Sequence, residues 1–155
     1  MSAKLAAQIQ LALGEIAQIR MELAPLIAKP PGHEADNMER AAACAMLHSF
    51  YTQIEKAFEL IAREWDGGVA TGESWHIDLL KQMARPTPRR QAVILETMLP
   101  DLREFLAFRH LFRGASIMLM RWEKLVPLLN RVDSTTNAVT ERLCAFIEFL
   151  DTQRE

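Results

Sequence analysis

Long apolar stripes at helical spacing constrain this 155-residue chain more than any other feature. Apolar side chains recur every three or four residues between residues 2 and 27, again from Leu47 to Trp65, and again from Trp122 to Leu150. This spacing gathers the apolar groups on one face of a helix and is typical of long helices that pack along one another. The sequence therefore predicts an all-α fold, an up-and-down helical bundle of about five helices.

Helix-breaking residues end each of the first two predicted helices. The first helix is expected over about 2–27 and ends before Pro30-Pro31, because proline cannot continue a helix. The second is expected from Asp36 or Asn37 to Trp65, and the run Asp66-Gly67-Gly68 is a turn signal that ends it.

The second half of the chain predicts shorter helices and one long one. A short third helix follows Ser74, a favoured N-cap residue. A fourth begins between Val93 and Pro100 and reaches about Arg113. A single last helix is expected over about 121–151, with a candidate kink at 133–136, where the residues favour helix weakly.

Length and composition predict one domain over residues 1–155. Half of the residues are hydrophobic, enough for a core, but no run of 18 apolar residues exists, so no membrane span is expected. The first ten residues do not resemble a signal peptide. Cys44 and Cys144 lie in helical patterns and are expected to be reduced core thiols, as in a cytoplasmic protein.

Charge is unevenly distributed along the chain. Eight basic and four acidic residues lie between Arg85 and Lys124, so this segment carries +4 while the remainder carries −6. A basic region on an acidic protein can hold a partner that bears phosphate groups. The alternative is a set of ordinary solvated helix faces, neutralised by nearby acids.

The most site-like stretch runs from Leu102 to Ser116, LREFLAFRHLFRGAS. Arg109, His110 and Arg113 are set into its apolar helical pattern, and an arginine buried in such a pattern requires a partner anion. A second candidate is the row His48, Tyr51 and Glu55, which share one helix face. That row either lines a site or forms a satisfied hydrogen-bond set at the edge of the core.

The run FRHLFRGAS resembles the signature region of the HepT-like ribonuclease toxins of the HEPN superfamily. Their signature is Arg, four residues, His, one residue, Tyr. Arg109 occupies the Arg position, whereas Gly114 occupies the His position and Ser116 the Tyr position. Residues 47–83 also resemble a HepT-like subgroup in the second helix, the DGG turn and the Trp-His helix, so the similarity extends from about residue 40 to the end.

The resemblance implies a helical homodimer in which the signatures of two protomers face a shared cleft. It implies a metal-independent endoribonuclease, the toxin of a toxin–antitoxin pair whose MntA-like nucleotidyltransferase antitoxin transfers AMP to the signature tyrosine. RNA would be the substrate, with no cofactor. The four histidines show no paired ligand spacing, so no metal site is expected.

Metal-free RNA cleavage needs a base for the 2′-OH, a cation for the phosphorane and an acid for the leaving oxygen. Arg109 and Arg113 are the candidate cations, and His110 is the candidate replacement for the missing histidine. Gly114 cannot transfer a proton, and losing such a group typically costs about 100- to 10,000-fold. Ser116 keeps a hydroxyl at the position where AMP would be attached.

These residues leave three interpretations open. The first is a HepT-like toxin with weakened or lost activity. The second is a non-catalytic helical partner of a MntA-like nucleotidyltransferase, favoured by the two replaced signature residues. The third is a helical dimer with an unrelated ligand.

Overall fold

A computed structural model describes residues 2–114 and 120–153, and it confirms the all-α prediction. Within those ranges the regular structure is helical, apart from one isolated bridge between Thr87 and Arg90. The elements in chain order are α1 (Ser2–Ile27), α2 (Asn37–Glu64), α3 (Trp75–Met83), the 3-10 helix η1 (Glu96–Met98), α4 (Leu99–Gly114), α5 (Trp122–Leu129) and α6 (Val132–Thr152).

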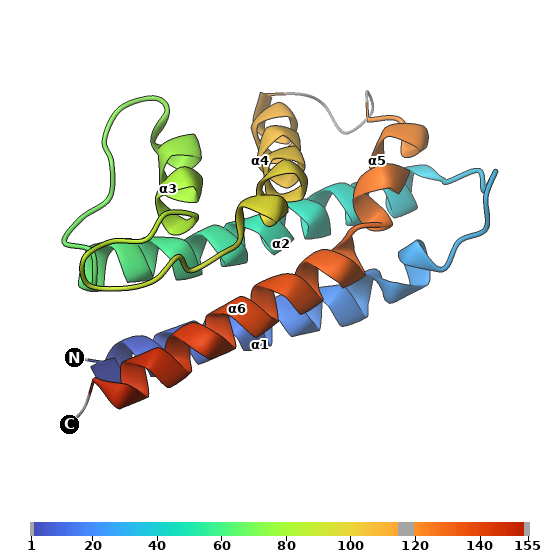
Figure 1. Cartoon of the computed structure of the whole chain (residues 1–155). Coiled ribbons are helices and arrows are strands. Elements are labelled where there is room, and N and C mark those ends of the chain that lie inside the picture. Colours follow the sequence, from blue (N-terminus) through green and yellow to red (C-terminus); the bar gives the residue numbers. More distant parts are fainter. Residues whose placement is uncertain (1, 115–119, 154–155) are drawn as a thin grey trace.

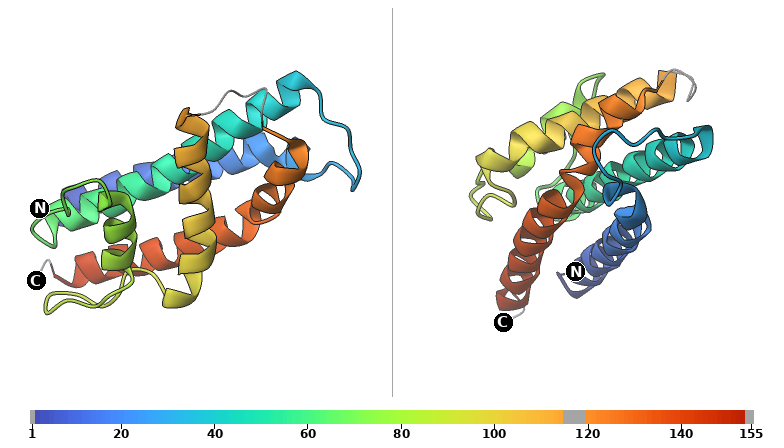
Figure 2. Two further views of the ribbon diagram at one scale, coloured as in Figure 1. Left: turned by 90° about the horizontal axis from the view of Figure 1, so that it is seen from above. Right: turned by 90° about the vertical axis from the view of Figure 1, so that its right-hand side faces the viewer.

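Helix α2 lies at the centre of the molecule and contacts α1, α3, α4 and α5. The long helix α1 packs along both α2 and α6 (Figure 1). The shorter α3 and α4 lie on the other side of α2 and cross it steeply, as Figure 1 and the left view of Figure 2 show. The bundle therefore has a layer of long helices covered by a layer of short ones.

The core follows the apolar stripes predicted from sequence. The α1 stripe is buried from Leu5 to Leu23 and the α2 stripe from Leu47 to Ile61. Between the layers, the rings of Phe50 on α2 and Phe105 on α4 meet edge to face with centroids 5.1 Å apart. Burying such aliphatic and aromatic side chains contributes about 1.5–3 kcal/mol each.

Local signals place the ends of α2 where the sequence predicts them. Asp36 accepts a hydrogen bond from the Glu39 backbone N–H, and the Glu39 carboxylate accepts one from the Asp36 N–H, which completes a capping box. At the other end, Gly67 and Gly68 have φ values of 92° and 157°, which a residue with a side chain rarely adopts.

Two sequence predictions are wrong in detail. The expected last helix is two helices, α5 and α6, and the break falls at Asn130–Arg131, just before the weak run 133–136. Pro127 inside α5 has no backbone N–H to donate, which weakens that helix. Cys44 is buried as expected, but Cys144 is exposed because it lies on the outer face of α6.

Ser74 occupies the N-cap position of α3, but its side chain makes no capping bond there. Its hydroxyl donates instead to the Asp78 carboxylate at 3.0 Å.

A search of the helices in residues 2–114 and 120–153 finds no candidate membrane span, because none combines sufficient length with sufficient hydropathy.

Candidate functional site

A polar row on α2 forms the base of the site. His48, Tyr51 and Glu55 are spaced three and four residues apart, so they lie along one helix face. This face is turned toward the layer of short helices, where α3 and α4 pack on α2. Tyr51 and Glu55 are buried, while His48 is half-buried.

Arg109 on α4 reaches this row and binds Glu55 with two nitrogens. Its Nη1 lies 2.8 Å from Oε1 of Glu55, and its Nη2 lies 3.0 Å from Oε2. The guanidinium also lies over the Tyr51 ring, 5.2 Å from the centroid. Arg109 is only 4% exposed, so the anion that its burial requires is supplied by the protein itself.

His76, the second residue of α3, shares the Glu55 carboxylate. Its Nδ1 lies 2.8 Å from Oε2 of Glu55 and 2.7 Å from Nη2 of Arg109. Its ring lies against that of Trp75 with centroids 3.7 Å apart. Glu55 therefore joins three helices at the site: it comes from α2 and holds one group from α3 and one from α4.

His110 and Arg113 are the exposed members of the cluster, and both lie near the end of α4. The His110 ring meets the His76 ring edge to face at 5.1 Å. Partial burial and the nearby charges of His76, Arg109 and Arg113 lower the pKa of His110, against an opposing effect of Glu55. His110 is therefore predominantly neutral, and able to accept a proton, at neutral pH.

His48, the first residue of the polar row on α2, contacts α4. Its ring contacts that of Phe112 with centroids 5.5 Å apart. Burial, together with the charges of Arg109 and Arg113, lowers the pKa of His48. Burial and the Glu55 charge raise the pKa of Tyr51, so its phenol stays protonated.

The structure brings most of the predicted site residues to one place. Arg109, His110 and Arg113 follow one another along the last turns of α4, and the row from His48 to Glu55 lies beneath them. Gly114 is the last residue of α4. Ser116 lies outside the described residues.

The basic segment divides into internal and surface cations. Arg90 and Arg109 are buried on Asp66 and Glu55, two acids from outside the segment. Arg85, Arg89, Arg103, Arg113, Arg121 and Lys124 are exposed. The charge of this segment is thus partly neutralised within the fold, and Arg113 is the exposed cation on the last turn of α4.

Sequence reasoning did not identify His76 as a site residue or join Glu55 to Arg109. His76 lies 33 residues before Arg109 and Glu55 lies 54 before it, and no local spacing relates them. The signals available were the buried position of Glu55 on an apolar helix face and the Trp-His pair at the start of α3.

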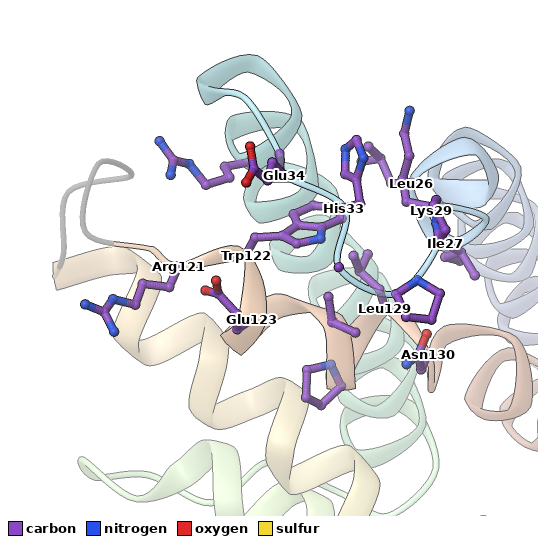
Figure 3. Close-up of a pocket in the computed structure, with 17 residues that line it drawn as sticks. Leu26, Ile27, Lys29, His33, Glu34, Arg121, Trp122, Glu123, Leu129 and Asn130 are labelled. Atoms are coloured by element: carbon purple, nitrogen blue, oxygen red, sulfur yellow. The ribbon is translucent and has the colours of Figure 1, made fainter.

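A separate hollow of about 1140 Å³ lies between the 28–36 loop and α5 (Figure 3). Its charges are mixed, since Arg40 and Arg121 line it together with Glu34 and Glu123. His33, at its rim, binds the Glu39 carboxylate at 2.9 Å. None of the signature-region residues that the structure describes lines this hollow, so it is distinct from the cluster on α4.

Comparison with known proteins identifies a family for this chain. A family model described as HepT-like protein matches residues 42–150, which include α3, the Arg109 helix and most of α2 and α6. No curated protein and no solved structure matches the chain significantly. The match extends over well over half of the sequence, and the chain is therefore a member of the HepT-like protein family.

Proposed function

We propose that this chain is the toxin of a toxin–antitoxin pair and a metal-independent endoribonuclease of reduced activity. The observation that carries the proposal is the cluster around Arg109, which places two imidazoles and an exposed guanidinium at one end of α4. Those are the groups that RNA transesterification requires: a proton acceptor, a proton donor and a cation for phosphate.

The residues would divide these roles according to their exposure. Arg113 would bind the phosphate, because it is exposed and, within the described residues, no carboxylate lies within ion-pair distance of it. His110 would remove the 2′-OH proton, because its lowered pKa keeps it neutral at pH 7. Arg109 would act as a positioning residue, since Glu55 already engages it and little of it is exposed.

Gly114 is the reason to expect reduced activity. It stands at the signature histidine position at the end of α4 and offers no proton-transfer group. The proposed partners follow from the family: a second copy of this chain, a MntA-like nucleotidyltransferase antitoxin and RNA, all in the cytoplasm. Attachment of AMP would then fall on the Ser116 hydroxyl or be absent from this member.

The test compares RNA cleavage by the natural chain with cleavage by Gly114→His, in the presence of a metal chelator. We expect Gly114→His to cleave about 100- to 10,000-fold faster, the typical contribution of one acid–base group. The same oligonucleotide with 2′-deoxyriboses should remain intact, because it lacks the nucleophile.

Arg113→Ala in the Gly114→His background should reduce cleavage, and Arg103→Ala serves as its matched control. Arg103 is an exposed arginine on the same helix, outside the cluster, so its removal should change the rate little. If Gly114→His neither binds nor cleaves RNA, the ribonuclease proposal is wrong. Co-purification of such an inactive protein with a neighbouring nucleotidyltransferase would instead support the non-catalytic partner role.

A further inference from the structure

We propose that His76 is a catalytic residue of this chain, the general acid that protonates the leaving 5′-oxygen of RNA while His110 acts as the base. The inference rests on the ribonuclease function proposed above and goes further, because it assigns a proton donor that the signature region does not contain. It starts from the position of the His76 ring between the Glu55 carboxylate and the exposed His110 ring.

The first step of the argument is the contact between His76 and Glu55. A carboxylate oxygen 2.8 Å from Nδ1 accepts a hydrogen bond from a protonated Nδ1. We therefore assign the Nδ1 proton to this bond, which leaves Nε2 as the atom that gains and loses a proton. Nη2 of Arg109 also lies 2.7 Å from Nδ1 but can only donate, so with Nδ1 protonated its hydrogen bond goes to the same Glu55 oxygen, at 3.0 Å.

The second step is the fixed orientation of the ring. Trp75 covers one side of the imidazole, with ring centroids 3.7 Å apart and planes tilted by 31°. The side chain of His76 retains 13% of its exposure, whereas those of Glu55 and Arg109 retain 6% and 4%. Of the three groups joined at Glu55, the imidazole is thus the one that is most open to a bound substrate.

The third step is the pairing with His110. An in-line displacement at phosphorus needs a base on the attacking side and an acid on the leaving side. Two imidazoles with centroids 5.1 Å apart can address the two oxygens of one phosphate. The charged and titratable groups around the pair are Glu55 on α2 and Arg109 and Arg113 on α4, in addition to the histidines themselves.

The proposed reaction balances without any added reagent. A neutral His110 nitrogen takes the 2′-OH proton as the 2′-oxygen bonds to phosphorus. The bond from phosphorus to the 5′-oxygen breaks, and Nε2–H of His76 gives its proton to that oxygen. The products are a 2′,3′-cyclic phosphate and a 5′-hydroxyl, and proton exchange with water restores both imidazoles.

The experiment uses two RNA substrates that differ in one atom, the bridging 5′-oxygen or a sulfur in its place. A thiolate leaves without protonation, so it does not need a general acid. We expect His76→Gln to slow cleavage of the oxygen substrate by about 100- to 10,000-fold and to slow the sulfur substrate by less than about tenfold. His110→Gln should slow both substrates by a similar factor.

The pH–rate profile gives a second readout that a merely structural role would not change. The natural chain should lose activity at low pH, where His110 gains a proton and can no longer act as the base. His110→Gln should lose this acidic limb, whereas His76→Gln should keep it while cleaving the oxygen substrate slowly. The control is His33→Gln, because His33 also binds a glutamate but lies at the rim of the separate hollow.

The outcomes separate this inference from the function on which it rests. If Gly114→His cleaves RNA but the natural chain does not, the ribonuclease proposal stands and the role of His76 is wrong. Equal loss on both substrates in a folded His76→Gln protein also overturns it. If neither the natural chain nor Gly114→His cleaves, the function itself fails and the inference falls with it.

Discussion

Two buried arginines, Arg90 and Arg109, hold a carboxylate in the same two-pronged way, yet their remaining contacts differ. Arg90 binds Asp66 through Nε and Nη2 at 2.7 and 2.5 Å, and its other donors reach the backbone carbonyls of Arg85, Gln91 and Gln82. Arg109 binds Glu55, but its third contact is an imidazole and its buried Nε has no partner among the described residues.

The difference distinguishes Arg90, whose contacts hold two parts of the fold together, from Arg109, which we propose belongs to the functional site. Arg90 uses its donors to tie the chain after α3 to the end of α2, and every contact is internal. Arg109 leaves a buried donor unsatisfied, which costs about 1–3 kcal/mol and is uncommon in a purely structural pair. Its neighbours include imidazoles that can exchange protons.

The largest expected effect on stability comes from removing the carboxylate that either arginine binds. Asp66→Ala and Glu55→Ala should each lower the free energy of unfolding by about 3–5 kcal/mol, because each leaves a buried guanidinium uncompensated. Urea denaturation measures this. The control is Asp133→Ala, whose ion pair with Arg20 is exposed and contributes at most about 1 kcal/mol. If Asp66→Ala lowers the free energy of unfolding by less than about 1 kcal/mol, Arg90 does not hold the chain after α3 to the end of α2 as described.

Replacing both members of each pair by apolar residues should sharpen the comparison. Arg90→Met with Asp66→Leu leaves the carbonyls that Arg90 satisfies without that donor, at about 1–3 kcal/mol for each one that stays unsatisfied. Arg109→Met with Glu55→Leu removes its own unsatisfied donor and leaves mainly His76 without a partner. The second double variant should therefore be the more stable of the two, by roughly 2 kcal/mol, in urea denaturation.

If instead the two double variants are equally stable, the donors of Arg90 would contribute no more than those of Arg109. The free energy of unfolding would then give no support to a structural role for Arg90 that differs from the role of Arg109. Circular dichroism of both variants checks that each remains helical, since an unfolded variant would give no comparison.

The smallest expected effect is on the pH dependence of stability. It concerns only the cluster around Arg109, which contains the histidines with lowered pKa values. The pKa values of His48 and His110 are lower in the folded chain than in a free histidine, so the unfolded chain binds more protons below about pH 6.5. Stability should therefore fall as pH decreases from 7 toward 5. Thermal unfolding of His48→Asn with His110→Asn should show a shallower fall, and an unchanged slope would refute the assignment.

Sequence periodicity predicted the helices well because each depends on neighbours in the chain. The capping residue Asp36, the DGG turn and the apolar stripes act within a few residues, and α1 and α2 have the expected limits. The split between α5 and α6 was misplaced by a few residues. Helix strength near Asn130 depends on how α5 packs, and local preference alone does not contain that information.

The candidate site was predicted only in part. The pattern around Arg109 indicated a site, and Arg109, His110 and Arg113 do lie together at the end of α4. It did not show that Arg109 points inward to Glu55, nor that His76 joins them. Those contacts depend on the angle at which α3 and α4 cross α2, which side-chain packing sets.

By itself, the sequence determined the helical class and the turns between helices, because these depend on the order and spacing of nearby residues. Tertiary structure alone decided which acid each arginine binds, and hence which cations remain exposed. The physical reason is that a buried guanidinium must find a carboxylate within about 3 Å, and only the packed layers place Glu55 there.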